Sequence, residues 1–383
     1  MTHQKTLCYA CAKVTIFWEK LMSNLPYWIA FNRVPGVGPV RFRALLDFFE
    51  DDIQAAWEAN ASQLAGAGLD SRTVKSIIKH RPKINLDHEM ALIEQHDVTV
   101  LTWHDPNYPN LLREIPAPPP VLYVRGELTS DDEWGVAIVG TRKMSAYGRR
   151  VTETLATGLA EAGLTIISGL ALGVDGMAHH CALQAGGRTI AVLANGLDRP
   201  YPAKNRKMAE AIVAQQKGAL ISDYPIGTPP EAKNFPPRNR IISGLSLGVV
   251  IVEAAERSGA LITARYAADQ NRELMAVPGS IFSRTSKGTN KLIVDGATPA
   301  ISVEAVLQAL DIQMVEPQKV VRQIIATTPI EERVLKELNN EPLQIDKIGQ
   351  RCGLTSAELS STLALLELKG LVRQVGGMSY IRI

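Results

Sequence analysis

The chain has 383 residues, of which 46% are hydrophobic, and a formal net charge of +2 at pH 7. This length suits two or three domains of ~100–200 residues, and the composition excludes a disordered or fibrous protein. Four cysteines are too few for a disulfide framework in a chain of this size. No apolar stretch is long enough for a transmembrane span and no signal peptide is evident, so we expect a cytoplasmic protein without a membrane partner.

Residues 1–25 differ from the rest and are interpreted as an N-terminal extension. Cys8 and Cys11 form a lone C-x-x-C with no second pair, so a zinc site is not expected. Met22 precedes a better-formed start, and the sequence leaves open whether translation begins at Met1 or Met22.

Residues 26–100 are predicted to form a small helical domain. A turn rich in glycine and proline, residues 32–39, separates two apolar segments. The second segment carries its large apolar residues on one face: Phe42, Leu45, Leu46 and Phe49. This pattern is typical of a helix-hairpin-helix, whose turn amides can hold a DNA phosphate. Phe42 stands where a small residue is common, so a purely structural helical cap is an equally good interpretation.

The stretch from Gly135 to Ala182 reads as strand, turn, helix, strand, turn, helix. Apolar runs at 136–139 and 164–167 suit strands that are buried on both faces. A glycine-containing turn follows each run. Tandem strand-to-helix units predict a parallel sheet in an α/β fold. The turns should lie side by side at the carboxyl edge of the strands, where ligands bind.

Other apolar runs extend this sheet into a predicted Rossmann-like domain over residues 101–311. They lie at 98–103, 121–124, 189–193, 219–222, 249–253 and 273–277.

The predicted edge favours anions. The first amides of each helix lack internal partners, and the helix dipole adds partial positive charge. Arg142 and Lys143 add full charges in the first turn. The spacing of Gly140 and Gly148 fits neither G-x-G-x-x-G nor a P-loop, so a phosphate is expected but no nucleotide cofactor. If the glycines served only packing, Arg142 would have no evident partner.

Two later segments are also basic. Residues 204–207 form the densest basic cluster, directly after a strand end and at a helix start. Cations are disfavoured at a helix N-terminus, and a bound polyanion would relieve that conflict. A solvated helix face is the alternative explanation. Lys233, Arg238 and Arg240 fall before the next apolar helix, on the same expected edge.

An enzyme would need a general base or nucleophile at the strand ends. The candidates are Asp175, His179, His180, Asp198, Asp223 and Glu253. Each has a structural interpretation.

Asp175 suits a cap on the following helix, and the two histidines lie inside that helix, where at least one should face the core. The other two aspartates suit turns. Glu253 is expected to pair with Arg238 or Arg240. Neither metal spacing nor a Ser-His-Asp order stands out, so neither a catalytic nor a metal site is predicted.

Residues 312–327 are predicted to be a linker and residues 328–383 a winged helix. Capping boxes begin at Thr328 and Thr355, and a short helix spans 345–351. A hairpin follows Gly370. The charges of this domain are balanced, which favours protein contact or dimer support over major-groove reading.

Together these stretches resemble the DNA-processing protein A family, DprA or Smf. The matching motifs are A-I-V-G-T-R (137–142), S-G-L-A-L-G-V-D (168–175), A-V-L-A-N-G-L-D (191–198), Y-P-A-K-N (201–205), F-P-P-R-N-R-I-I-S-G-L-S (235–246), S-G-A-L-I-T-A (258–264) and A-V-P-G (276–279). The resemblance covers the chain from about Pro26 to Ile383. The family more often has serine at Thr141 and glycine at Ala194, and both changes are mild.

The resemblance implies an extended Rossmann domain that binds single-stranded DNA, preceded by a helical domain similar to a sterile alpha motif. It also implies protection of incoming strands during natural transformation, loading of the RecA recombinase, and homodimers formed through the Rossmann domain. The DNA-binding residues predicted from the turns, the basic segments and this resemblance are Arg142, Lys143, Gly148, Ser168, Gly169, Lys204, Asn205, Arg206, Lys207, Lys233, Arg238, Asn239 and Arg240.

Aromatic stacking is the usual complement in single-strand binding. Tyr147, Tyr201 and Phe235 are the candidates, and packing is an equal interpretation for each. Two other functions stay open. A phosphoribohydrolase-type enzyme shares a similar sheet, but this chain lacks P-G-G-x-G-T-x-x-E. A winged-helix regulator with a ligand-sensing Rossmann domain is disfavoured by the neutral winged helix.

Overall fold

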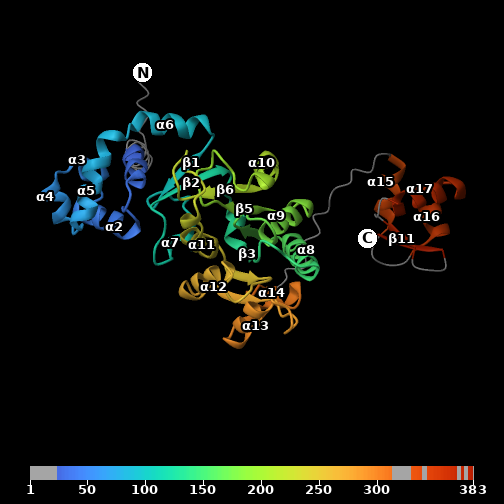
Figure 1. Ribbon diagram of the computed structural model, residues 1–383. Coiled ribbons are helices and arrows are strands. Elements are labelled where there is room, and N and C mark those ends of the chain that lie inside the picture. The colour runs from blue at the N-terminus through green and yellow to red at the C-terminus, as the bar shows by residue number, and fades with distance from the viewer. Residues whose placement is uncertain (1–23, 313–328, 339–342, 369–371, 375–377, 383) are drawn as a thin grey trace, which may run out of the picture. The chain divides into compact units, whose positions relative to one another are not determined.

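The computed structural model describes residues 24–312, 329–338, 343–368, 372–374 and 378–382 (Figure 1). The chain divides into two compact units, Met1–Met314 and Val315–Ile383. Most of the predicted N-terminal extension, with Cys8 and Cys11, and the predicted linker beyond residue 312 lie outside the described residues.

The first unit begins with short helices. They are a helix over residues 24–33, α2 (Pro39–Phe48), α3 (Ile53–Glu58), α4 (Ala61–Gly66), α5 (Ser71–His80), the 3₁₀ turn η1 (Arg81–Lys83) and α6 (Leu86–Gln95). Pro39 starts α2 after a turn in which Gly36 has a φ of +94°. Phe42, Leu45 and Leu46 are buried, as the one-sided apolar pattern predicts.

A nine-stranded sheet follows, in the order β1-β2-β6-β5-β4-β3-β7-β8-β9. The strands are β1 (Thr99–Thr102), β2 (Val121–Gly126), β3 (Gly135–Val139), β4 (Thr165–Ser168), β5 (Thr189–Val192), β6 (Gly218–Ser222), β7 (Gly248–Ile251), β8 (Glu273–Ala276) and β9 (Thr298–Pro299). From β6 to β9 all neighbours are parallel, as predicted. The antiparallel pairing of β1 with β2 and of β2 with β6, and the short edge strand β9, were not predicted.

Helices cover both faces of the sheet (Figure 1). They are α7 (Asn110–Arg113), η2 (Ser130–Trp134), α8 (Ala146–Glu161), α9 (Val174–Gln184), η3 (Ala203–Asn205), α10 (Arg206–Ala214), η4 (Ala232–Asn234), α11 (Phe235–Gly244), α12 (Ala260–Asp269), α13 (Lys287–Val294) and α14 (Val303–Ala309).

Strand β3 alternates between the two cores. Val136 and Ile138 pack with α8, α9 and α14, whereas Ala137 and Val139 join the cluster that contains α11 and α12. Burial on both faces explains the continuous apolar run of this strand.

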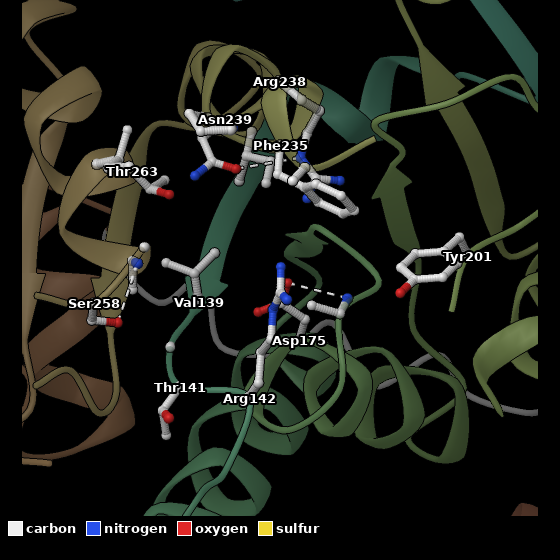
Figure 2. A pocket seen from close by; sticks show the side chains of 18 of the residues that line it. Val139, Thr141, Arg142, Asp175, Tyr201, Phe235, Arg238, Asn239, Ser258 and Thr263 are labelled. Carbon is white, nitrogen blue, oxygen red and sulfur yellow. Dashed lines mark hydrogen bonds between the residues drawn. The ribbon is translucent and has the colours of Figure 1, made fainter. Parts of the chain in front are cut away.

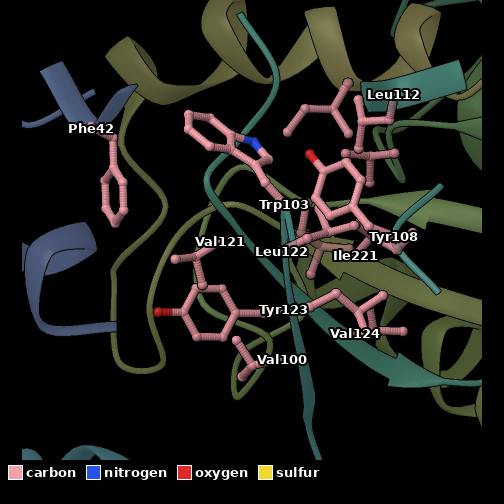
Figure 3. Close-up of a cluster of buried hydrophobic side chains, with 14 of the residues drawn as sticks. Phe42, Val100, Trp103, Tyr108, Leu112, Val121, Leu122, Tyr123, Val124 and Ile221 are labelled. Carbon is pink, nitrogen blue, oxygen red and sulfur yellow. The ribbon is translucent and has the colours of Figure 1, made fainter. Parts of the chain in front are cut away.

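The helical region and the sheet share one hydrophobic core. Trp28 stacks on Phe42 with ring centroids 4.9 Å apart, and Phe42 meets Trp103, which follows β1, at 5.9 Å. Figure 3 shows Phe42 approaching the cluster around Trp103 and Tyr123. The buried Tyr123 hydroxyl donates to Asn32 Oδ1 at 3.2 Å. The helices therefore pack directly onto the antiparallel end of the sheet.

The second unit is a winged helix. It contains α15 (Pro329–Glu337), β10 (Leu343–Gln344), α16 (Ile345–Cys352), α17 (Ser356–Leu368), β11 (Val372–Gln374) and β12 (Ser379–Arg382). The strands form an antiparallel sheet in the order β10-β12-β11. The capping box at Thr355 is confirmed, because Thr355 N donates to Glu358 Oε2 and Glu358 N donates to Thr355 Oγ1. The other predicted box begins at Thr328, outside the described residues.

In the part of the chain that the structure describes, no helix is both long enough and apolar enough to cross a bilayer.

Candidate functional site

A cleft of about 600 Å³ opens at the carboxyl end of β3 (Figure 2). Strand β4 pairs with one side of β3 and β7 pairs with the other. The connections that lead to these two strands therefore run to opposite sides of β3. Such a switch point leaves a crevice in parallel sheets. The lining residues that carry polar or aromatic side chains are Thr141, Arg142, Asp175, Tyr201, Phe235, Arg238, Asn239, Ser258 and Thr263.

One wall of the cleft is the loop after β3, residues 140–145, here called the cation loop. Arg142 and Lys143 are both exposed on it, and Arg142 lines the cleft. The loop ends at Ser145, which caps α8 by accepting a hydrogen bond from Gly148 N at 3.0 Å. The helix therefore begins where the sequence pattern predicts.

The turn after β4 packs tightly against the cation loop. Gly173 has a φ of +83°, and a Cβ on it would come within 2.8 Å of Arg142 Cα and closer still to the carbonyl oxygen of Thr141. Val174 N donates to that same oxygen at 3.2 Å. Only glycine satisfies both the backbone conformation and the close approach. The two turns lie side by side, as the tandem motif predicts.

A buried arginine and a buried aspartate form the floor of the cleft. Arg238 is only 4% exposed and donates through Nη1 to the carbonyl oxygens of Gly169, at 3.0 Å, and Val192. Burial lowers the pKa of Arg238 to about 10, so the guanidinium stays charged at neutral pH. Asp175 accepts from Ala171 N at 3.3 Å, and burial raises the pKa of this carboxyl.

An aromatic ring lies between the two arginines of the cleft. The guanidinium carbon of Arg142 is 5.3 Å from the centroid of Phe235, and that of Arg238 is 5.8 Å from it. Tyr201 meets the same ring at 6.0 Å and is half exposed. In Figure 2 these side chains surround one opening. The cleft thus combines positive charge with exposed aromatic surface.

The other basic residues lie outside the cleft. Lys204, Arg206 and Lys207 are exposed around the start of α10. The Asn205 side chain points toward the turn after β4. Its amide donates there to the carbonyl oxygens of Leu170, at 2.8 Å, and Ala171, at 3.1 Å. Because Ala171 lines the cleft, this bond fixes the basic cluster beside the cleft wall.

Lys233 follows the cleft residue Ala232; it is exposed and pairs with Glu231 at 2.5 Å. Asn239 lines the cleft and accepts from Arg238 Nε at 3.3 Å.

Four of the residues predicted to contact DNA have structural roles. Ser168 is fully buried and donates to Ile138 O at 2.7 Å. Gly169 is buried, and a Cβ there would come 2.7 Å from Arg238 Nη2. Gly148 is buried inside α8. Arg240 pairs with Asp223 at 2.9 Å. Each of the four therefore has a role within the fold, and its contact with DNA stays a prediction.

Two predictions about acidic residues are wrong. Glu253 pairs with neither Arg238 nor Arg240; its carboxylate accepts hydrogen bonds from Ser145 and Thr285. Asp175 does not cap α9, because Gly173 is the N-cap residue and makes no side-chain cap. The partners of Glu253 lie on neighbouring loops that sequence spacing alone does not reveal, whereas Asp175 accepts from Ala171 N, four residues earlier in the same turn.

The structural interpretations of Asp198 and the two histidines hold, whereas the Asp223 side chain pairs with Arg240 instead of bonding within its turn. His179 is buried, and its Nδ1 lies 2.7 Å from Thr189 Oγ1, whereas His180 is exposed. Burial lowers the pKa of His179 to about 3, so this ring is neutral. Asp198 accepts from Gly227 N in a turn. Across the described residues there is no group of three or more His, Cys, Asp or Glu that could hold a metal.

Sequence reasoning missed Ser258 and Thr263, which line the cleft from the start of α12. Their segment, S-G-A-L-I-T-A, stood out as a motif but could be placed at the cleft only once the pairing of β7 with β3 was known. Knowledge that β7 lies next to β3 would therefore have placed both residues at the cleft.

Family models and known sequences that are similar to this chain all come from one group of DNA-processing proteins. The family described as DNA recombination-mediator protein A matches residues 99–311, and the DprA winged helix domain matches residues 318–378. The Smf protein of Synechocystis sp. is 38% identical over 397 residues, covering 94% of this chain and 99% of its own.

Two solved structures are also similar. DNA processing protein A of Streptococcus pneumoniae is 34% identical, with a TM-score of 0.65 over 74% of this chain and 97% of that one. DNA processing protein A of Helicobacter pylori, described for its unique single-stranded DNA binding mode, is 33% identical, with a TM-score of 0.50 over 56% and 95%.

Substitution of Gly173 tests the close packing of the two turns. Gly173→Ala should lower the free energy of unfolding by about 1–3 kcal/mol for a backbone conformation, φ +83° and ψ −128°, that favours glycine, and by about a further 1–3 kcal/mol for the clash with the cation loop. Gly186→Ala is the matched control, because Gly186 has a φ of +72° and no atom lies within 4 Å of its ideal Cβ. Urea unfolding of both variants measures the difference, and equal losses would contradict the close approach.

Proposed function

The chain belongs to the DNA recombination-mediator protein A family (DprA/Smf). From that premise we propose that it binds and protects single-stranded DNA at the cleft. We also propose that it loads the RecA recombinase onto this DNA during natural transformation. The observation that carries the proposal is the pair of guanidinium groups, Arg142 and Arg238, that contact one partly buried aromatic ring, Phe235, at the switch point. We propose that a backbone phosphate binds at Arg142, with Arg238 supplying fixed positive potential from below.

The shape of the cleft favours a single strand over a duplex. A flexible strand can turn a phosphate or a base into a recessed opening, whereas paired bases are held inside the duplex. Every base has a flat face that can stack on an aromatic side chain, so such binding depends weakly on sequence. The exposed edge of Tyr201 supports that contact.

The basic cluster extends the proposed path of the strand. Lys204, Arg206 and Lys207 are exposed beside the wall that Asn205 holds, and they would neutralise further phosphates. Lys143 and Lys233 are exposed near the same opening. The similarity to the Helicobacter pylori protein supports the assignment of single-stranded DNA as the ligand.

We further propose that the chain acts as a binding protein rather than an enzyme. The cleft carboxylate, Asp175, lies among cations and a backbone amide, and His179 is held neutral against Thr189. Both arrangements have structural explanations. Incubation with nucleoside monophosphates tests the phosphoribohydrolase alternative, since release of free base would contradict a pure binding role.

A homodimer through the Rossmann-like domain is part of the proposal. Large apolar side chains are exposed near the edge strand β9: Ile281 (75%), Phe282 (92%), Val294 (85%) and Ile301 (73%). Ile281 lines the same groove as Asp295, the residue after Val294. Exposed apolar surface of this kind marks association sites. We propose a second copy of the chain as its occupant.

Arg142→Ala tests the DNA site. Hydrogen bonds to charged groups contribute about 1.5–3 kcal/mol, so affinity for an oligothymidylate should fall about tenfold or more. The slope of log affinity against log salt should become shallower by about 0.7, the contribution of one single-strand phosphate. Fluorescence polarisation at several salt concentrations measures both quantities.

The control for this variant is Arg72→Ala, which removes an exposed arginine of α5 that lines neither the cleft nor the groove of the proposed dimer. The same two proteins should differ in how fast RecA assembles on a strand that is already covered by a single-strand-binding protein. If Arg142→Ala matches the control in both assays, the proposed site is wrong.

The buried Asp175 carboxyl should make the affinity for DNA depend on pH. Burial raises the pKa of this carboxyl, so as the pH falls it takes up a proton earlier than an exposed aspartate would. Protonation removes a negative charge from the cleft, so oligothymidylate affinity at fixed ionic strength should rise as the pH falls toward the raised pKa of this carboxyl. Asp175→Asn should bind tightly throughout and show a flatter curve. Parallel curves for the two proteins would assign the pH dependence to other groups.

Phe282→Asp tests the dimer. A charge at this exposed ring should be costly to bury between two copies, so the variant should sediment as a monomer where the wild-type protein sediments as a dimer. Val40→Asp, on the exposed surface of α2, is the control and should remain dimeric. A wild-type protein that is monomeric at all measured concentrations would rule the dimer out.

A further inference from the structure

Building on the proposed function, we propose that Glu253 and Thr285 are positioning residues for Arg142. Neither residue lines the cleft. They act on the DNA site through the backbone of the cation loop, which they hold in one conformation.

Glu253 fastens both ends of the cation loop. Its backbone carbonyl oxygen accepts from Thr141 N at 2.9 Å. Its carboxylate accepts from Ser145 N at 2.8 Å and from Ser145 Oγ at 2.7 Å. Arg142 and Lys143 lie between these two anchors. One residue at the end of β7 therefore fixes the span from which the proposed DNA contact projects.

Arg142 depends on this backbone for its position. Its guanidinium contacts the Phe235 ring at 5.3 Å, and within the described residues no protein group accepts a hydrogen bond from it. The buried Asp175 carboxylate attracts the guanidinium without a direct hydrogen bond to it, so the backbone of the cation loop largely sets where the side chain projects. Movement of residues 141–145 would therefore move the charge away from the cleft.

Thr285 completes the anchor from a separate loop. Its hydroxyl donates to Glu253 Oε1 at 2.8 Å, and its carbonyl oxygen accepts from Ala254 N at 2.8 Å. Glu253 is 2% exposed, so its carboxylate needs these donors to remain buried. The threonine hydroxyl is the donor that does not belong to the cation loop, and it holds the carboxylate in the orientation that reaches Ser145.

This arrangement explains why glycine occupies position 148. A Cβ there would come 2.5 Å from the carboxyl carbon of Glu253, and nearer still to its Oε2. Gly148 was predicted as a DNA contact, and we infer that it affects DNA only by leaving room for the carboxylate that holds the cation loop.

Thr285→Val tests the inference without leaving a cavity beside Glu253, because valine has nearly the same shape as threonine and lacks only the hydroxyl. Loss of one hydrogen bond should weaken oligothymidylate binding about two- to tenfold and make the salt slope shallower, toward that of Arg142→Ala. Thr285→Ser, which keeps the hydroxyl, should restore both quantities. Thr289→Val is the matched control, since this buried threonine donates to Ser286 O inside α13.

The double variant Thr285→Val/Arg142→Ala separates positioning from general stability. If Thr285 acts through Arg142, the double variant should bind no more weakly than Arg142→Ala alone. Independent, multiplying losses would overturn the inference, as would wild-type affinity in a folded Thr285→Val protein. A wild-type protein that fails to bind oligothymidylate would overturn the proposed function itself, and the positioning role with it.

Discussion

The close approach of two turns at the end of β3 is the constraint on which the cleft depends. Gly173 lets the turn after β4 rest against Thr141 and Arg142, and Glu253 ties the other side of the same loop to β7. The cation loop is therefore held between the two strands that flank β3. A flexible arginine on a rigid loop loses less freedom on binding than one on a mobile loop, so this packing favours capture of an anion.

The two cleft arginines have different proposed roles because one is buried and the other is exposed. Arg238 is buried, and backbone carbonyl oxygens hold it in one place. Arg142 is exposed and free to meet a ligand. The buried Asp175 offsets part of the positive charge below the opening. A fixed cation below and a movable one above suit a charged chain that must bind firmly without base-specific contacts.

The sequence predicted the parallel core, the paired turns, the one-sided helix α2 and the winged helix, because each leaves a local periodic or capping signal. Strand direction leaves no such signal, so the antiparallel pairing of β2 was missed. Arg238 and Arg240 look equivalent in sequence, yet one forms the cleft floor and the other pairs with Asp223. The partners of Glu253 come from residues 108 and 32 positions away. Such contacts are set by tertiary packing and follow only from the fold.

A crystal structure with a short oligothymidylate tests the central claim most directly. The account predicts a phosphate within hydrogen-bonding distance of Arg142, at the opening between the cation loop and Phe235, with Arg238 in its present position below. A strand bound across another surface while this cleft stays empty, or a cleft occupied by a tightly copurified dinucleotide, would contradict it.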